Sequence, residues 1–130
     1  MPIPPPPPQT LIWPHGAPAA GQPQKADFGT HTLSISHHDS HGEAEVHAAG
    51  ATLMICQSGE ADLLYGGNLV NPRRLSPTEL RGTTLSNATR IHVSPGDVIH
   101  FAPAAPHQWI VAPGQTATFL VVHIIESRPK

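Results

Sequence analysis

Glu45 and His47 stand one residue apart in the short run Glu43–His47, which has the composition of a β-strand. Alternate residues of a strand project to the same face, so these two side chains converge as two metal ligands would. A second stretch, Gly96–Phe101, is followed by a turn that delivers His107. Two imidazoles and one carboxylate are donors that suit a divalent metal. The two stretches therefore look like two halves of one metal site.

These stretches resemble the two sequence motifs of the cupin family, whose members take metal ligands from neighbouring strands of a small β-barrel. The first cupin motif usually reads His-x-His, then three or four residues, a Glu, six residues and a Gly. His47 takes the second His position, and Gly59 takes the closing Gly position. Glu45 stands at the first His position, and Thr52 stands where the acidic ligand is expected. Because a Thr hydroxyl is a neutral, weak ligand, the metal would either use Glu45 as its carboxylate or be absent.

The second cupin motif usually runs Gly-Asp, an apolar pair, Pro-x-Gly and then a His. Gly96 and Asp97 match this pattern, and so does the eleven-residue step from Gly96 to His107. Ala102 and Ala104 stand in place of the Pro and the Gly. The second motif therefore matches at its first two residues and at its final His, but not at the Pro and Gly between them.

The resemblance covers about residues 28–126 and is to small bacterial single-domain cupins. It implies an all-β fold, an antiparallel β-barrel or double-stranded β-helix (jelly roll), over residues 28–130. It also implies a metal-dependent enzyme acting on a small organic molecule, of dioxygenase, isomerase or lyase type. Residues 1–27 are expected to form a Pro-rich N-terminal arm or tail, since such segments favour extended polyproline II.

The metal ligands that the resemblance implies are Glu45, His47 and His107, around one divalent ion. Fe, Mn, Zn and Ni all remain candidates, because affinity order alone does not select the metal. Glu45 has a second interpretation, as an ordinary strand residue paired with Arg90 or His123. Two other functions stay open: a non-catalytic cupin that binds a small ligand or stores metal, and a metal-free cupin in which His47 acts as acid or base.

A histidine in the last apolar strand is the candidate for proton transfer. His123 lies within Phe119–Ile125, where a polar side chain that points inward needs a partner. We expect it to be the catalytic acid or base, to orient the carboxylate or to be a fourth ligand; a hydrogen-bonded histidine of the barrel wall is the alternative. Met54, Phe101 and Trp109 are expected to line the substrate pocket.

Period-2 alternation of apolar and polar residues is the main structural signal, and no run has a helical period of useful length. The segment 52–57 is expected to form a hairpin with 61–65. The segment 68–88 is expected to be an irregular loop that covers the pocket. The expected strands are 30–37, 43–47, 52–57, 61–65, 89–93, 98–101, 108–111 and 116–125.

Composition limits the classes of partner. The net charge of −2, with seven Lys and Arg among 130 residues, gives no basic surface for nucleic acid. No apolar run reaches the roughly 18 to 20 residues of a membrane span. We expect a small-molecule substrate or ligand, and a homodimer in which Leu11–Trp13 packs on the neighbouring subunit. The N-terminus shows no secretory signal, so a cytoplasmic location is expected, or a periplasmic one if a signal was removed.

Overall fold

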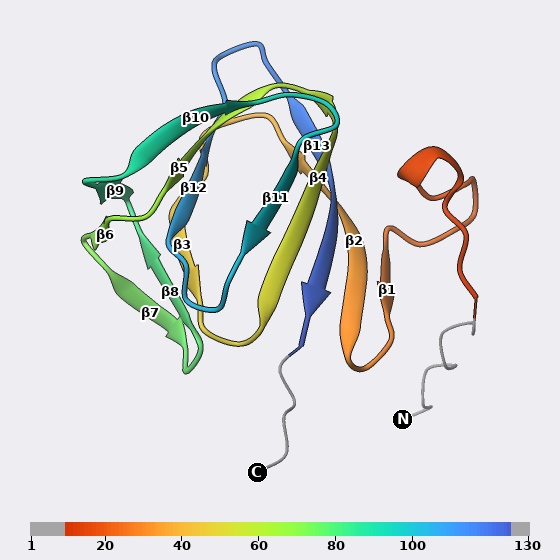
Figure 1. The fold of residues 1–130 in the computed structure, drawn as a ribbon, viewed down its shortest axis with the longest axis horizontal. Helices are drawn as coiled ribbons and strands as arrows, with labels where there is room; N and C mark the ends of the chain where they lie inside the picture. The colour runs from red at the N-terminus through yellow and green to blue at the C-terminus, as the bar shows by residue number, and fades with distance from the viewer. Residues whose placement is uncertain (1–9, 126–130) are drawn as a thin grey trace.

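The fold is built from antiparallel strands. The computed structural model describes residues 10–125, so the proline run Pro4–Pro8 lies outside the described residues. The strands form a five-stranded sheet, a six-stranded sheet and a separate two-stranded pair. Figure 1 shows the two larger sheets on opposite sides of a common interior. The predicted all-β class is therefore confirmed.

The strand order places segments that are distant in sequence side by side. The five-stranded sheet runs β1 (Lys25–Asp27), β2 (His31–His38), β13 (Ala117–Ile124), β4 (Ala51–Gly59) and β11 (Val98–Phe101). The six-stranded sheet runs β10 (Thr89–Val93), β5 (Ala61–Tyr65), β12 (His107–Ile110), β3 (Ala44–His47), β8 (Glu79–Gly82) and β7 (Arg73–Ser76). The separate pair is β6 (Asn68–Val70) and β9 (Thr84–Ser86).

The hydrophobic core lies between the two larger sheets. β4, β11 and β13 contribute Met54, Phe101 and Phe119, and the facing strands β5 and β12 contribute Leu63 and Trp109. The rings of Trp109 and Phe119 meet across the interior, with centroids 4.5 Å apart. Burial of large apolar side chains from both sheets stabilises the fold and holds the polar side chains between them in place.

The strands β4 and β5 do not form the expected hairpin. β4 pairs with β11 and β13, whereas β5 pairs with β10 and β12, so the chain crosses between the sheets after Gly59. Gly59 has a φ of +78°, and a Cβ there would lie 1.9 Å from the carbonyl oxygen of Thr116. Only glycine meets both demands, which explains the residue that closes the first motif.

Two segments differ from expectation, although all eight predicted strands are present with small shifts at their ends. The segment 68–88 is not an irregular loop: it contains β6 to β9, and β8 pairs with β3. Strand β1 lies within the expected arm and pairs with β2, after a 3-10 turn, η1 (Pro14–Gly16). Among the described residues, no helix is long and apolar enough to cross a membrane.

Candidate metal centre

Three neighbouring strands bring the predicted ligands to one face of the six-stranded sheet. Glu45 of β3 is paired with His107 of β12 on one side and with Arg81 of β8 on the other. His47 is paired with Glu79 of β8. Directly paired residues project to the same face, and Glu45 shares that face with His47 because one residue separates them. The register alone therefore gathers two imidazoles, two carboxylates and a guanidinium.

Glu45 lies between the two histidines. Its Oε1 is 3.5 Å from His47 Nε2, and its Oε2 is 3.6 Å from His107 Nε2. The two imidazole rings lie 6.1 Å apart between centroids and are nearly parallel, at 25°. Each ring thus faces a different oxygen of the same carboxylate.

The second nitrogen of each ring is held by an acceptor outside this group. His107 Nδ1 donates a hydrogen bond to the carbonyl oxygen of Ala105, at 3.1 Å. His47 Nδ1 lies 3.4 Å from Glu79 Oε1. When Nδ1 carries the proton, Nε2 has a lone pair, and in each ring that lone pair then faces the Glu45 carboxylate. An Nε2 lone pair and a carboxylate oxygen are both acceptors and repel each other. A cation bound between them removes this repulsion.

Arg81 joins the two carboxylates on the β8 side. Arg81 Nη2 lies 2.9 Å from Glu45 Oε1, and Arg81 Nε donates to Glu79 Oε2 at 2.5 Å. The alternative partner expected for Glu45, Arg90, instead binds Asp62 at 2.7 Å. Glu79 and Arg81 were not predicted as site residues, because they lie in the segment 68–88, which was expected to be a loop. The alternation Glu79-Leu80-Arg81 was the available signal.

The electrostatics of the cluster keep Glu45 ionised. Burial acts to raise its pKa, but the facing imidazoles of His107 and His47 and the charge of Arg81 outweigh burial and hold the pKa of Glu45 well below its usual value. The contact with Glu45, aided by the charge of Glu79, raises the pKa of His47 despite partial burial. The carboxylate is therefore available to a cation near neutral pH.

The predicted ligands line one cavity of about 550 Å³ between the sheets. Glu45, His47 and His107 lie in its wall, together with Met54 and Trp109 of the expected substrate pocket. The cavity is therefore polar on the β3 side and apolar where it meets the core.

Phe101, the third expected pocket residue, does not line this cavity. Its ring stacks on His107, with centroids 4.0 Å apart and planes 15° apart. The side chain forms part of a second cavity instead. Phe101 therefore packs against His107 without lining the cavity that Met54 and Trp109 line, and its role in a substrate pocket stays a prediction.

His123 also lines the polar cavity, but its hydrogen bond is not to Glu45. His123 Nδ1 and Thr52 Oγ1 lie 3.1 Å apart, and the two residues are paired between β13 and β4. Burial lowers the pKa of His123, and the charge of His47 lowers it further. His123 therefore presents a neutral imidazole to the cavity near neutral pH.

Two more side chains of the cavity were not singled out from the sequence. Ser36 Oγ and His38 Nε2 of β2 lie 2.6 Å apart, and both line the cavity. The His38 ring also packs edge-on against Phe119, with centroids 5.7 Å apart, and burial lowers its pKa. The i, i+2 spacing on a predicted strand was the signal that would have found them.

The donor set fits a divalent metal. Glu45, His47 and Glu79 offer ligand atoms that all lie within 4.8 Å of one another, a group that shares two residues with the predicted set. Donors bound to one ion at about 2.1 Å stand roughly 3 to 3.4 Å apart. Within the predicted set, Glu45 Oε1 lies 3.5 Å from His47 Nε2 and Glu45 Oε2 lies 3.6 Å from His107 Nε2, which is close to this spacing. His107 is not a member of the three-residue group, so its ring has to move toward His47 for all three predicted ligands to reach one ion.

Comparison with known proteins bears on the fold. A scan against models of protein families gave no match, and neither did a search of curated proteins. Among solved structures, the DMSP lyase DddQ from Ruegeria pomeroyi DSS-3 matches with a TM-score of 0.54 and 14% identity, over 78% of this chain and 41% of that chain. Hydroxypropylphosphonic acid epoxidase from S. wedmorenis matches at 0.54 and 13%, over 73% and 44%. The chain spans less than half the length of these two enzymes.

A cupin protein from Bacteroides fragilis matches with a TM-score of 0.51 and 15% identity, over 78% of this chain and 70% of that chain. Complexes of CoII HppE and FeII HppE with substrate match with TM-scores of 0.53 and 0.52, each at 13% identity. Identities this low speak to the fold alone. The chain has the cupin fold, as its two sequence motifs predicted.

Proposed function

We propose that this protein is a metal-dependent cupin enzyme that acts on a small organic molecule, with one divalent ion bound by Glu45, His47 and His107. The observation that carries the proposal is the orientation of both imidazoles. Each Nδ1 faces an outer acceptor, Glu79 Oε1 or the carbonyl of Ala105, and each Nε2 faces Glu45. Metal-binding histidines are held in this way, because the outer acceptor fixes the tautomer and aims the ring.

His107 is preferred to Glu79 as the third ligand. Glu45, His47 and His107 line the cavity, whereas Glu79 is absent from its wall. Glu79 also binds Arg81 through Oε2 and faces His47 Nδ1 through Oε1, so both of its oxygens are engaged. The cavity wall therefore presents His107, and not Glu79, beside Glu45 and His47.

The metal ion, His123 and the apolar wall would have separate roles in catalysis. A bound divalent ion would act as a Lewis acid on a substrate oxygen. His123, neutral and hydrogen-bonded to Thr52, is placed to accept a proton from the substrate. Met54 and Trp109 form an apolar wall that excludes water and packs against the hydrocarbon part of the substrate. A dioxygenase, isomerase or lyase reaction would use the ion, the His123 base and this apolar wall.

Metal analysis of four variants tests the ligand set. Glu45→Gln should lower bound metal sharply, and His47→Ala and His107→Ala should each abolish it, since two ligands hold an ion poorly. Thr52→Val should change metal content little, because the hydroxyl binds His123. Glu60→Gln is the matched control, since Glu60 pairs with His92 and lies outside the cavity. Full metal occupancy in Glu45→Gln would refute the proposal.

A metal-free acid–base enzyme is the second candidate. The contact between Arg81 and Glu45 favours it, because the guanidinium already neutralises the carboxylate. A purified protein that turns over substrate after complete removal of metal would select this candidate. A non-catalytic cupin is distinguished by His123→Gln, which should retain metal and lose turnover only if the protein is an enzyme.

A further inference from the structure

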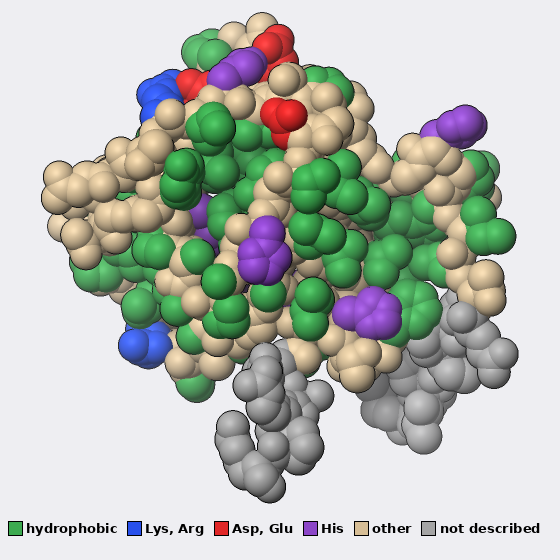
Figure 2. Space-filling view, in the orientation of Figure 1, with side chains coloured by type: hydrophobic (Ala, Val, Ile, Leu, Met, Phe, Trp, Pro, Cys, Tyr) green, Lys and Arg blue, Asp and Glu red, His purple; other side chains and the backbone are tan. Residues whose placement is uncertain are grey.

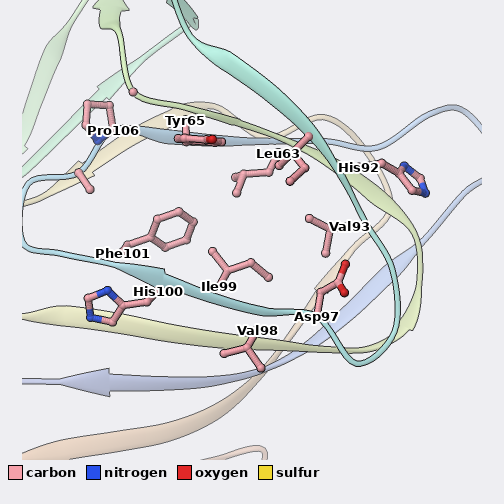
Figure 3. Close-up of a pocket in the computed structure, with 13 residues that line it drawn as sticks. Leu63, Tyr65, His92, Val93, Asp97, Val98, Ile99, His100, Phe101 and Pro106 are labelled. Carbon is pink, nitrogen blue, oxygen red and sulfur yellow. The ribbon is translucent and has the colours of Figure 1, made fainter.

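A second cavity, of about 590 Å³, opens on the opposite side of the core between the edge strands β10 and β11. Figure 3 shows Leu63, Val93, Ile99 and Phe101 directed into this space from β5, β10 and β11. We call it the apolar groove. None of the candidate metal ligands lines it, and the Phe101 ring, stacked on His107, stands between the groove and the metal centre.

The groove has a buried floor and an exposed rim. Leu63, Val93 and Phe101 in the floor are only 4%, 3% and 6% exposed. Ile91 and Val98 at the rim are 50% and 63% exposed, and Tyr65 beside them is also exposed. These three account for half of the large hydrophobic side chains that are exposed in the described part of the chain. Figure 2 shows hydrophobic side chains gathered over this face.

Charged groups at the groove are turned away or already paired. The nitrogens of His92 lie 2.8 Å from Asp62 and 2.7 Å from Glu60, and Figure 3 shows its ring directed away from the cavity. The Asp97 carboxylate accepts a hydrogen bond from the Ser94 backbone N–H at 2.9 Å. His100 shares the outer face of β11 with Val98, so both line the rim of the groove and neither reaches its floor. The floor is therefore neutral.

We propose that the apolar groove binds a neutral, apolar small molecule of one or two rings, at a site separate from the metal centre. Its volume lies within the roughly 300 to 1,000 Å³ of small-molecule sites, and its buried apolar floor with an exposed rim has their usual shape. A charged ligand would lose its hydration without gaining a partner in the floor. The site does not depend on the proposed catalytic function.

Titration with naphthalene tests the groove. In methyl-labelled protein, the resonances of Leu63, Val93 and Ile99 should shift saturably, while those of Ile12 and Ile124 should not. The rim variant Ile91→Asp should fold normally, because Ile91 is half exposed, and should weaken binding roughly tenfold. Leu75→Asp is the matched control: Leu75 is 52% exposed on β7, away from the groove, and its replacement should leave binding within about twofold.

Three results would overturn the proposal. One is the absence of saturable shifts up to the solubility limit of naphthalene. Another is equal weakening by Leu75→Asp, which would mean non-specific association. The third is a wild-type mass in light scattering that falls to the monomer value in Ile91→Asp, which would assign the groove to an interface between two copies of the chain.

Discussion

The variant Glu79→Gln tests whether Glu79 is a metal ligand or only the hydrogen-bond acceptor that orients the ligand His47. If Glu79 only accepts the Nδ1 proton of His47, the amide oxygen can still accept it. The variant then loses the negative charge and the oxygen that accepts from Arg81, because an amide NH2 cannot accept a hydrogen bond. Loss of such an outer contact costs about 10- to 100-fold in metal affinity, or roughly 1.4 to 2.8 kcal/mol. The contact is 3.4 Å long and its side chains are 35% and 20% exposed, so solvent screening favours the lower end, near tenfold.

Isothermal titration of the metal-free protein with Zn²⁺, at one pH and ionic strength, measures this loss. His107→Ala in the same titration should show no binding at the site, and Glu60→Gln, whose partner His92 lies outside the cluster, should bind as the wild type does. Our assignment would be refuted by the reverse order: a loss above about a thousandfold in Glu79→Gln together with retained binding in His107→Ala. That outcome would make Glu45, His47 and Glu79 the ligands.

Three further expectations concern pH, packing and assembly. Because the pKa of His47 is raised in the metal-free protein, protons compete with the metal: titrations should show full affinity above that pKa, falling as pH drops through it. Phe119→Ala should lower the free energy of unfolding in urea by about 3 to 5 kcal/mol, since Phe119 is fully buried against Trp109, whereas a loss below about 1 kcal/mol would contradict the described core. The expected homodimer should give a light-scattering mass about twice 13.8 kDa, and a monomer mass at every concentration would exclude it.

Strand positions were predictable because one face of each strand is buried. The alternation around Leu33 and Ile35 and the apolar run that ends at Ile125 give β2 and β13 within one residue at each end. The hairpin expected at Gly59 failed for a topological reason. Adjacent strands often pair, but a glycine at φ +78° directs the chain into the facing sheet, and local sequence does not distinguish the two turns.

The candidate site was predictable only as far as its motifs reach. The spacing of Glu45 and His47 and the motif position of His107 place three side chains in one cavity. Glu79 and Arg81 enter the site because β8 pairs with β3 across more than thirty residues of chain, and such pairing depends on the whole fold. Phe101 lines a different cavity from Met54 and Trp109 because its strand, β11, is the edge strand of the opposite sheet, and local sequence does not reveal strand order.

The most direct test of the central claim is a crystal structure of the protein loaded with Zn²⁺ or Mn²⁺, with the ion located by its anomalous scattering. We predict a single ion in the polar cavity, bonded at about 2.1 Å to Glu45, His47 Nε2 and His107 Nε2. Arg81 should remain beside the Glu45 carboxylate. An ion bonded to Glu79 with His107 outside the coordination sphere would contradict the ligand set. No ion at the cluster at saturating metal would contradict the metal-dependent function itself.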